Sequence, residues 1–177
     1  ITEIAELRRL VCARDSDRLL ACAADMASRF TAGGRLLAFG NGGSSTDAQD
    51  LASLFVSAAR PLPAFGLTND IAVITALSND VGFDVVFSRQ IATFGRAGDI
   101  AVGLSTSGSS ANLLPAFAQA RRLGLTTVGF AGGDGGAMAS SRDIDHLFVV
   151  PSSSVHRIQE TQTTLYHVLW ELTLELL

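Results

Sequence analysis

Residues 36–55 read LLAFGNGGSSTDAQDLASLF, and this stretch decides the fold. The apolar run over 36–40 has the length and composition of a buried strand, and a turn rich in glycine and serine follows it. Apolar residues then recur at helical spacing. In this order, backbone N–H groups at the positive end of a helix dipole point into the turn. The stretch therefore predicts a strand, an anion-binding turn and a helix.

The turn over 40–45 has a second interpretation, because a glycine turn with a serine N-cap begins many helices that bind nothing. A dinucleotide fingerprint is a weaker match, since Ser45 stands where its third glycine belongs. A second turn favours a ligand: DIAVGLS at 99–105 runs into STSGSS at 105–110, and a helical pattern opens at Ala111. Two hydroxyl-rich turns in one sheet can converge on one anion. Neither has the lysine of a P-loop, which favours a phosphorylated sugar over ATP.

Short apolar runs alternate with helical segments along the rest of the chain, which predicts parallel strands with helices on both faces of the sheet. The expected fold is α/β, a three-layer αβα sandwich with a doubly wound five-stranded parallel sheet. One or two N-terminal helices end at TAGGR, and a long apolar helix ends the chain. No repeat or linker interrupts the sequence, so we expect one domain over 1–177. The runs are RLLAFG, LPAFGL, DIAVGLS, TTVGFA and DHLFVVP.

Charge and cysteine content narrow the class of protein. The chain has 17 acidic and 13 basic residues, a net charge of −4 that gives no overall attraction to a nucleic acid, so we expect none as partner. No apolar run approaches the roughly 20 residues that span a bilayer, and we expect no membrane partner. Cys12 and Cys22 match no metal spacing and fall in an expected helix. We interpret them as reduced thiols, which indicates a cytoplasmic protein.

Four motifs, in order and over nearly the whole chain, resemble the sugar isomerase (SIS) domain family, and most closely its phosphoheptose isomerase branch. They are GNGGSS.DAQ, TALSNDVGFDVVFSRQI, GDIAVGLSTSGSS.N and RIQE followed by His167. That branch interconverts sedoheptulose 7-phosphate and a heptose 7-phosphate, a ketose–aldose exchange through an enediol. The resemblance implies an isomerase of this type. It also implies a homotetramer with sites at subunit interfaces, and the long apolar C-terminal helix favours an oligomer.

The resemblance also assigns roles to individual residues. His167, on the last helix, would be the base that removes a proton next to the carbonyl. Gln159 would reach the substrate or a metal. The sugar phosphate would lie on the two turns and on the SND segment. The substrate-binding residues implied in this way are Asn41, Gly42, Gly43, Ser44, Asn79, Asp80, Ser105, Thr106, Ser107, Ser110 and Gln159.

The helix after the first turn departs from the family pattern, which has a histidine and, four residues later, a glutamate on the same helix face. Asp50 and Leu54 occupy those positions. The family builds a zinc site from that pair and from the glutamine and histidine of the last helix. The resemblance therefore implies a partial zinc site of Gln159 and His167, to which Asp50 can add an oxygen ligand. Leu54 can neither bind a metal nor accept a proton.

Two hypotheses follow from this departure. In the first, the chain is an isomerase with His167 and Asp50 as catalytic residues, and Asp80 or Glu160 are further carboxylates that could replace the absent glutamate. In the second, it is a non-catalytic or altered-specificity SIS module that binds a sugar phosphate or docks on a protein. A lone histidine on an apolar helix is commonly a core or interface residue. However, a docking protein would not need His167 beside a complete phosphate site, which favours the enzyme.

Overall fold

A computed structural model describes residues 2–177. Its five strands are all parallel and lie in the order β2-β1-β3-β4-β5. Each strand falls on one of the five apolar runs, which confirms the predicted doubly wound parallel sheet. The strands are β1 (Leu36–Gly40), β2 (Ala64–Gly66), β3 (Ile100–Ser105), β4 (Thr126–Gly132) and β5 (His146–Val150).

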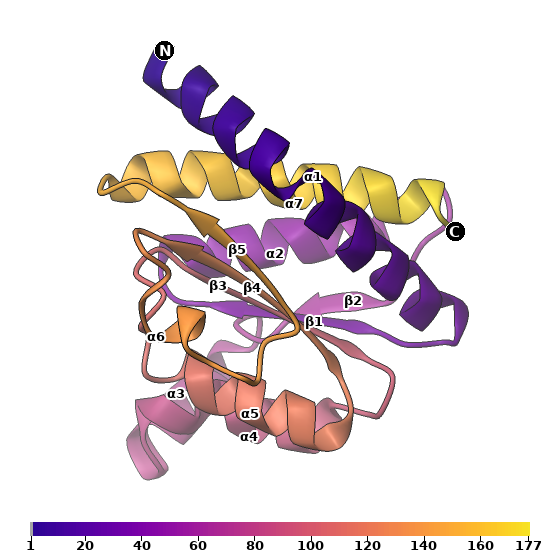
Figure 1. Ribbon diagram of the computed structural model, residues 1–177. Coiled ribbons are helices and arrows are strands. Elements are labelled where there is room, and N and C mark those ends of the chain that lie inside the picture. Colours follow the sequence, from indigo (N-terminus) through magenta and orange to yellow (C-terminus); the bar gives the residue numbers. More distant parts are fainter. Residues whose placement is uncertain (1) are drawn as a thin grey trace.

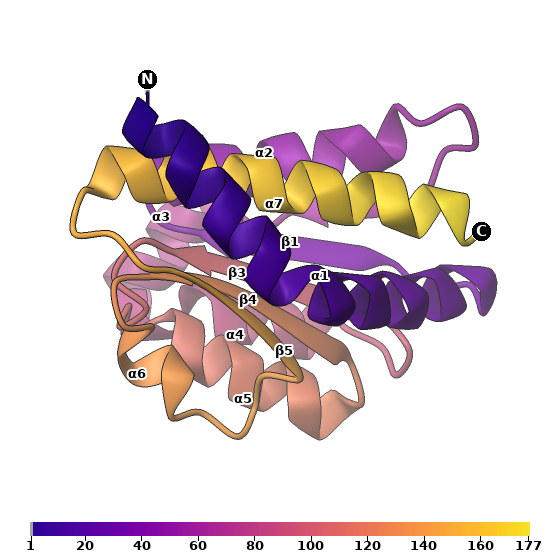
Figure 2. The same cartoon turned by 45° about the horizontal axis from the view of Figure 1, so that its top comes forward.

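Helices cover both faces of the sheet, as Figures 1 and 2 show from two directions. One face carries α1 (Thr2–Thr31), α2 (Gly43–Val56) and α7 (Val155–Glu175). The opposite face carries α3 (Ile71–Asp80), the 3-10 turn η1 (Phe83–Val85), α4 (Val86–Phe94), α5 (Leu113–Leu123) and α6 (Gly136–Ala139). The N-terminal region is one continuous helix. Within residues 2–177, no helix combines the length and the apolar character needed to cross a bilayer.

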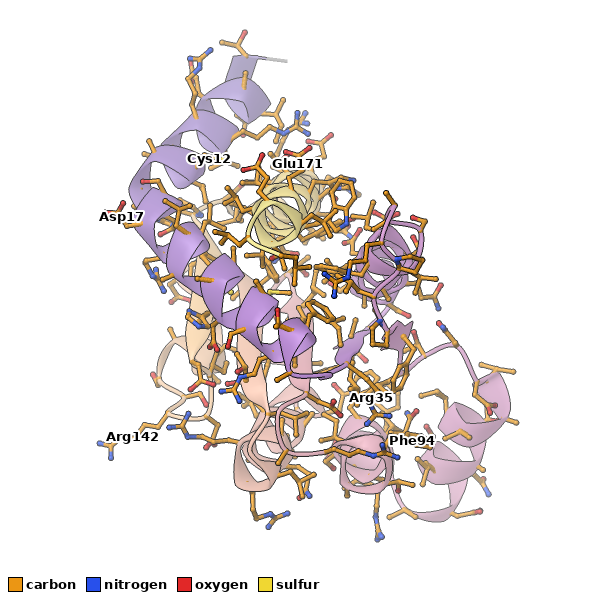
Figure 3. All side chains as sticks on the ribbon, turned by 90° about the vertical axis from the view of Figure 1, so that its right-hand side faces the viewer. Cys12, Asp17, Arg35, Phe94, Arg142 and Glu171 are labelled. Atoms are coloured by element: carbon orange, nitrogen blue, oxygen red, sulfur yellow. The ribbon has the colours of Figure 1, made fainter. Side chains whose placement is uncertain are left out.

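Two apolar layers hold the helices against the sheet. On one side, Phe39 of β1 packs on Phe87 and Phe117, with ring centroids 5.4 and 5.2 Å apart. On the other side, the core gathers aliphatic and aromatic side chains of α1, α2 and α7 over the strands. Figure 3 looks along α7, which lies between α1 and α2. Because the strands are buried between these layers, the loops at their carboxyl ends begin at fixed positions.

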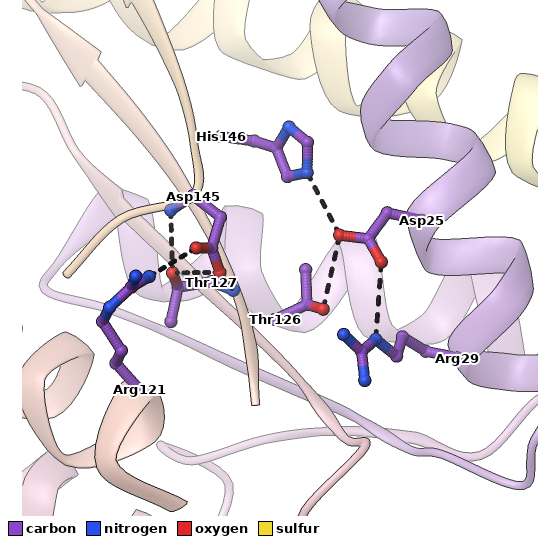
Figure 4. A network of polar contacts seen from close by, with 7 residues as sticks. All are labelled: Asp25, Arg29, Arg121, Thr126, Thr127, Asp145 and His146. Carbon is purple, nitrogen blue, oxygen red and sulfur yellow. Dashed lines mark hydrogen bonds and ion pairs between the residues drawn. The ribbon is translucent and has the colours of Figure 1, made fainter. Parts of the chain in front are cut away.

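A polar network ties α1 to the amino ends of β4 and β5 (Figure 4). Asp25 of α1 accepts a hydrogen bond from Thr126 at 3.4 Å and pairs with Arg29 at 3.4 Å. His146 is half-buried and lies 3.3 Å from the same carboxylate. This histidine is therefore part of an anchor between a helix and two strands, at the end of the sheet opposite to the two turns.

A neighbouring carboxylate in this network, Asp145, gives a first test of stability. It accepts hydrogen bonds from the N–H and hydroxyl of Thr127, both at 3.0 Å, and pairs with Arg121 at 2.5 Å. Burial by itself would raise the pKa of Asp145, but these bonds outweigh it and hold the pKa below its ordinary value. We expect Asp145→Asn to cost about 1–2 kcal/mol of unfolding free energy at neutral pH, measured by urea titration.

The sign of the pH dependence follows from that lowered pKa. The stabilisation is fully present above the unfolded-state pKa of about 4, and it is lost as the pH falls through the lower folded-state pKa. The difference between wild type and Asp145→Asn should therefore shrink below about pH 4. Asp143→Asn is the matched control, because within residues 2–177 the Asp143 carboxylate makes no hydrogen bond or ion pair. An unchanged difference in acid would refute this account of Asp145.

Candidate active site

The two predicted turns meet at the carboxyl ends of β1 and β3. These strands are neighbours, with Gly40 opposite Leu104, and the helices that follow them, α2 and α5, leave to opposite faces of the sheet. In a sheet of this strand order, the winding reverses at this point, and such folds bind their ligands there. Both turns line one small cavity of about 110 Å³, which confirms that they converge. Its lining residues are Asn41, Ser44, Leu104, Ser105, Thr106, Ser107 and Ser110.

The first turn is shaped by glycine and has no serine cap. Gly42 is the N-cap of α2, with φ of +57°, a conformation that side chains rarely adopt, and it makes no side-chain cap bond. Ser44 and Ser45 lie within the first turn of the helix, so the interpretation as a serine-capped turn was wrong. Ser44 is buried against the cavity. Ser45 instead donates to Thr68 at 2.7 Å and does not line the cavity.

The second turn gathers serine hydroxyls around one point. The Ser105 Oγ lies 2.9 Å from the Ser110 Oγ and 3.3 Å from the Ser107 Oγ, and it accepts the Gly108 N–H at 3.1 Å. The Ser109 N–H donates to the Ser107 Oγ at 3.2 Å, but the Ser109 hydroxyl is not part of this group and accepts the Ala137 N–H of α6 at 3.0 Å. This bond anchors the turn to the loop after β4. Three convergent hydroxyls in a cavity can donate to the oxygens of an anion.

An amide pair joins the two turns. The Asn41 side chain donates to Asn112 at 2.8 Å, and Asn112 donates back at 2.9 Å. Asn112 is buried and its side chain makes no cap bond to α5, so the pair with Asn41 is what holds its amide in one orientation. The sequence analysis did not name Asn112 as a site residue. The available signal was the motif GDIAVGLSTSGSS.N, of which Asn112 is the last residue.

A row of polar contacts runs from α2 to α7 beside the cavity. Burial raises the pKa of the Asp47 carboxyl above its ordinary value, the Gln159 amide partly offsets this, and the charge of Asp50 adds to it. Within residues 2–177 the Asp47 Oδ2 atom is buried without a hydrogen-bond partner. Gln159 packs on the first turn so closely that a Cβ on Gly43 would lie 2.1 Å from its amide nitrogen. Asp50 accepts a hydrogen bond at 2.8 Å from the hydroxyl of Tyr166. Burial raises the pKa of Tyr166, so this hydroxyl stays protonated and is the donor. Sequence analysis missed Asp47 and Tyr166.

His167 has the tautomer that a base requires. Its Nδ1 atom lies 2.8 Å from the carbonyl oxygen of Thr163, and because a carbonyl can only accept, Nδ1 carries the hydrogen. In neutral imidazole, the Nε2 atom then has a free lone pair. The side chain is half-buried, and its ring stacks on that of Tyr166 with centroids 5.0 Å apart.

The other carboxylates named from the sequence lie elsewhere. Asp80 is exposed at the last residue of α3, where it accepts a hydrogen bond from Asn79 at 2.8 Å, and neither residue lines the cavity. Glu160 points to solvent and pairs with Arg157 at 2.5 Å. Asp50 is therefore the carboxylate that the structure brings next to the His167 segment.

The donor set on α2 and α7 does not fit a zinc ion. Leu54 has no donor atom and packs against the apolar core. The Asp50 Oδ2 atom accepts the hydrogen bond of Tyr166, and the Gln159 amide packs against Gly43 of the first turn. Across the described chain, residues 2–177, no group of three or more His, Cys, Asp or Glu side chains has the arrangement that a metal ion needs. The chemistry of this site is therefore derived from side chains alone.

These features define a doubly wound domain, whose hydroxyl-lined cavity lies at the switch point of the sheet. Residues 1–132 match the SIS domain family, and the chain belongs to this family. It is 46% identical over 175 residues to the phosphoheptose isomerase of Chlorobaculum parvum, covering 95% of this chain and 83% of that protein. It is 40% identical over 178 residues to that of Aquifex aeolicus, covering 98% and 92%. The structure of phosphoheptose isomerase GmhA from Neisseria gonorrhoeae superimposes with a TM-score of 0.92 at 35% identity, covering 98% of this chain and 94% of that one.

Proposed function

We propose that this chain is a ketose–aldose isomerase that interconverts sedoheptulose 7-phosphate and a heptose 7-phosphate through an enediol. The observation that carries the proposal is a cavity with three convergent serine hydroxyls beside a helix whose histidine has the tautomer of a base. The relatives named as phosphoheptose isomerases support this substrate class.

The phosphate group is held by hydroxyls and backbone rather than by a lysine or arginine, since neither lines the cavity. Because hydroxyl donors are uncharged, phosphate binding here depends more on how the donors are placed than on electrostatic attraction. Gln159 and the exposed pair Asn79 and Asp80 contact the sugar, the latter two in a site formed between subunits. The phosphate-binding residues are Asn41, Gly42, Gly43, Ser44, Ser105, Thr106, Ser107 and Ser110.

The chemistry needs one proton moved between neighbouring carbons and one between their oxygens. The Nε2 lone pair of His167 removes the proton from the carbon next to the carbonyl, while the carbonyl oxygen receives the proton of the neighbouring hydroxyl through Asp50, which leaves the enediol as its monoanion. His167 then returns its proton to the other carbon. Asp50 transfers the hydroxyl proton between the two oxygens, with its free Oδ1 atom as the acceptor.

Assembly and location complete the proposal. Residues 1–177 form one SIS domain of a cytoplasmic homotetramer, with sites at the subunit interfaces. The support is the apolar surface of α3 and η1, where Ile71 is 70% exposed and Phe83 is 51% exposed. Side chains of this kind commonly mark a surface that a partner covers.

The second hypothesis, a docking protein without catalysis, is not favoured, because the similar proteins are named as isomerases.

Turnover by the purified full chain tests the proposed function. Sedoheptulose 7-phosphate is supplied, and the aldose phosphate is followed by NMR, with unphosphorylated sedoheptulose as the control. We expect conversion of the phosphorylated sugar alone, because the hydroxyl-lined cavity needs the phosphate to hold the substrate. Chelator and added zinc should leave the rate unchanged, since Leu54 and the Tyr166 bond leave no zinc site. Tight binding of the sugar phosphate without any turnover would instead establish a binding module.

A further inference from the structure

Tyr166 lies between the two groups that the proposed reaction uses. It is one of the largest fully buried side chains, only 1% exposed, and its ring is enclosed by the core of α1, α2 and α7. Its hydroxyl reaches out of that core to the Asp50 carboxylate at 2.8 Å. One face of its ring stacks on His167, with an angle of 27° between the rings. A single immobile side chain therefore contacts both groups.

The contact with Asp50 fixes a side chain that would otherwise be free. Asp50 is exposed on α2, and within residues 2–177 the Tyr166 hydroxyl is its side chain's only hydrogen-bond partner. A bond to a carboxylate is stronger than one between neutral groups, and this donor cannot move because its ring is packed. Only the Oδ2 atom is occupied. The Oδ1 atom therefore has a defined place from which to accept a proton.

The neighbours of this pair explain why the hydroxyl matters. Leu54, one turn further along α2, supplies no polar contact. The charge of Asp47, one turn before, also acts on the Tyr166 hydroxyl, but the hydroxyl bonds Asp50. Of the two carboxylates on this side of α2, Asp50 is therefore the one with a fixed donor.

We propose that Tyr166 is a positioning residue, which fixes the orientation of the Asp50 carboxylate and so takes the place of the histidine and glutamate pair that this chain lacks. This inference rests on the proposed isomerase function. Tyr166 makes no contact with substrate in this scheme. It holds one reacting group through its hydroxyl and the other through its ring.

Tyr166→Phe removes the hydroxyl and keeps the ring, so the stacking on His167 remains. We expect kcat for sedoheptulose 7-phosphate to fall about 10- to 100-fold, because Asp50 loses the donor that fixes its position, with KM unchanged. Thr161→Val is the matched control. It removes another buried hydroxyl of α7, which is bonded at 2.8 Å to the Arg157 carbonyl and not to Asp50, and it should leave kcat unchanged.

A double-mutant cycle separates positioning from a general structural effect. Asp50→Asn alone should lower kcat, and adding Tyr166→Phe should lower it no further, because the hydroxyl acts only through Asp50. If Tyr166→Phe lowers kcat by the same factor in the wild-type and in the Asp50→Asn protein, the inference is wrong. Asp50→Glu provides a second, exposed variant, which should also lower kcat because the longer side chain cannot sit on the fixed hydroxyl in the same place.

The outcomes distinguish the inference from the function it rests on. If the wild-type chain turns over sedoheptulose 7-phosphate and Tyr166→Phe keeps its kcat, the positioning role alone is wrong. If Tyr166→Phe does not fold, as judged by circular dichroism, an unchanged kcat for Asp50→Glu overturns it equally. No wild-type turnover overturns the proposed function and this inference together.

Discussion

His167→Gln lowers kcat for sedoheptulose 7-phosphate by about 10²- to 10⁴-fold, the range expected when a general base is lost. Glutamine approaches the length of histidine but has no basic nitrogen, so the substrate still binds and KM changes little. The structural reason is the tautomer: the Nδ1 atom is bonded to the Thr163 carbonyl, which leaves the Nε2 atom as the acceptor. Steady-state kinetics with the purified variant provide the measurement.

His156→Gln is the control for this result, because His156 is an exposed histidine in the first turn of the same helix. It should retain the wild-type rate. Circular dichroism and the elution volume on gel filtration should match the wild type for both variants. A His167→Gln enzyme with undiminished kcat would remove His167 as the base and return it to the role of a packing residue.

Gly108→Ala should disrupt the second turn, residues 105–110, to which we assign the phosphate of the substrate. Gly108 has φ of +65°, and a Cβ there would lie 2.1 Å from the carbonyl oxygen of Gly135. Backbone on both sides must move, and Ser105 then loses the Gly108 N–H that orients its hydroxyl. We expect a loss of about 3 kcal/mol in unfolding free energy, measured by urea titration. We also expect a rise in KM of at least about tenfold, which corresponds to 1.4 kcal/mol of lost binding.

Gly133→Ala separates the clash from backbone strain. Gly133 also has φ of +65°, but a Cβ there would meet nothing within 4 Å. This variant should lose only about 1–2 kcal/mol of stability, the cost of the strained conformation, and should keep the wild-type KM. If Gly108→Ala loses no more stability than Gly133→Ala and keeps the wild-type KM, the close approach of Gly108 to Gly135 does not shape the second turn.

The fold was predictable because its signals are local. Each apolar run became a strand, and the two turns converge because β1 and β3 are neighbours, with Gly40 opposite Leu104. The error lay in the first turn, where Gly42 rather than a serine is the N-cap. In a turn rich in glycine and serine, the backbone φ angle decides which of the two residue types is the N-cap. The sequence places both types side by side in this turn and does not reveal φ.

The α2 and α7 contacts could not be predicted from the sequence. In the run TLYHVLWEL, Tyr166 has the spacing of an apolar stripe, and nothing in the helix indicates that its hydroxyl meets a carboxylate 116 positions earlier. Asp47 was missed for the same reason. Such pairs depend on how two helices dock on the sheet, which is set by the core as a whole. In contrast, Gln159 and His167 were named from the sequence because RIQE and the histidine that follows it match the family pattern.

The polar anchor described for Asp25, His146 and Thr126 lies at the amino ends of the strands, whereas the cavity lies at their carboxyl ends. Damage at one end of the sheet is therefore not transmitted directly to the other. None of the residues that line the cavity belongs to this anchor. A directed-evolution campaign on this scaffold can thus vary exposed side chains at the carboxyl ends of the strands, with Gly108 and Tyr166 kept, and reinforce the amino ends in a separate step.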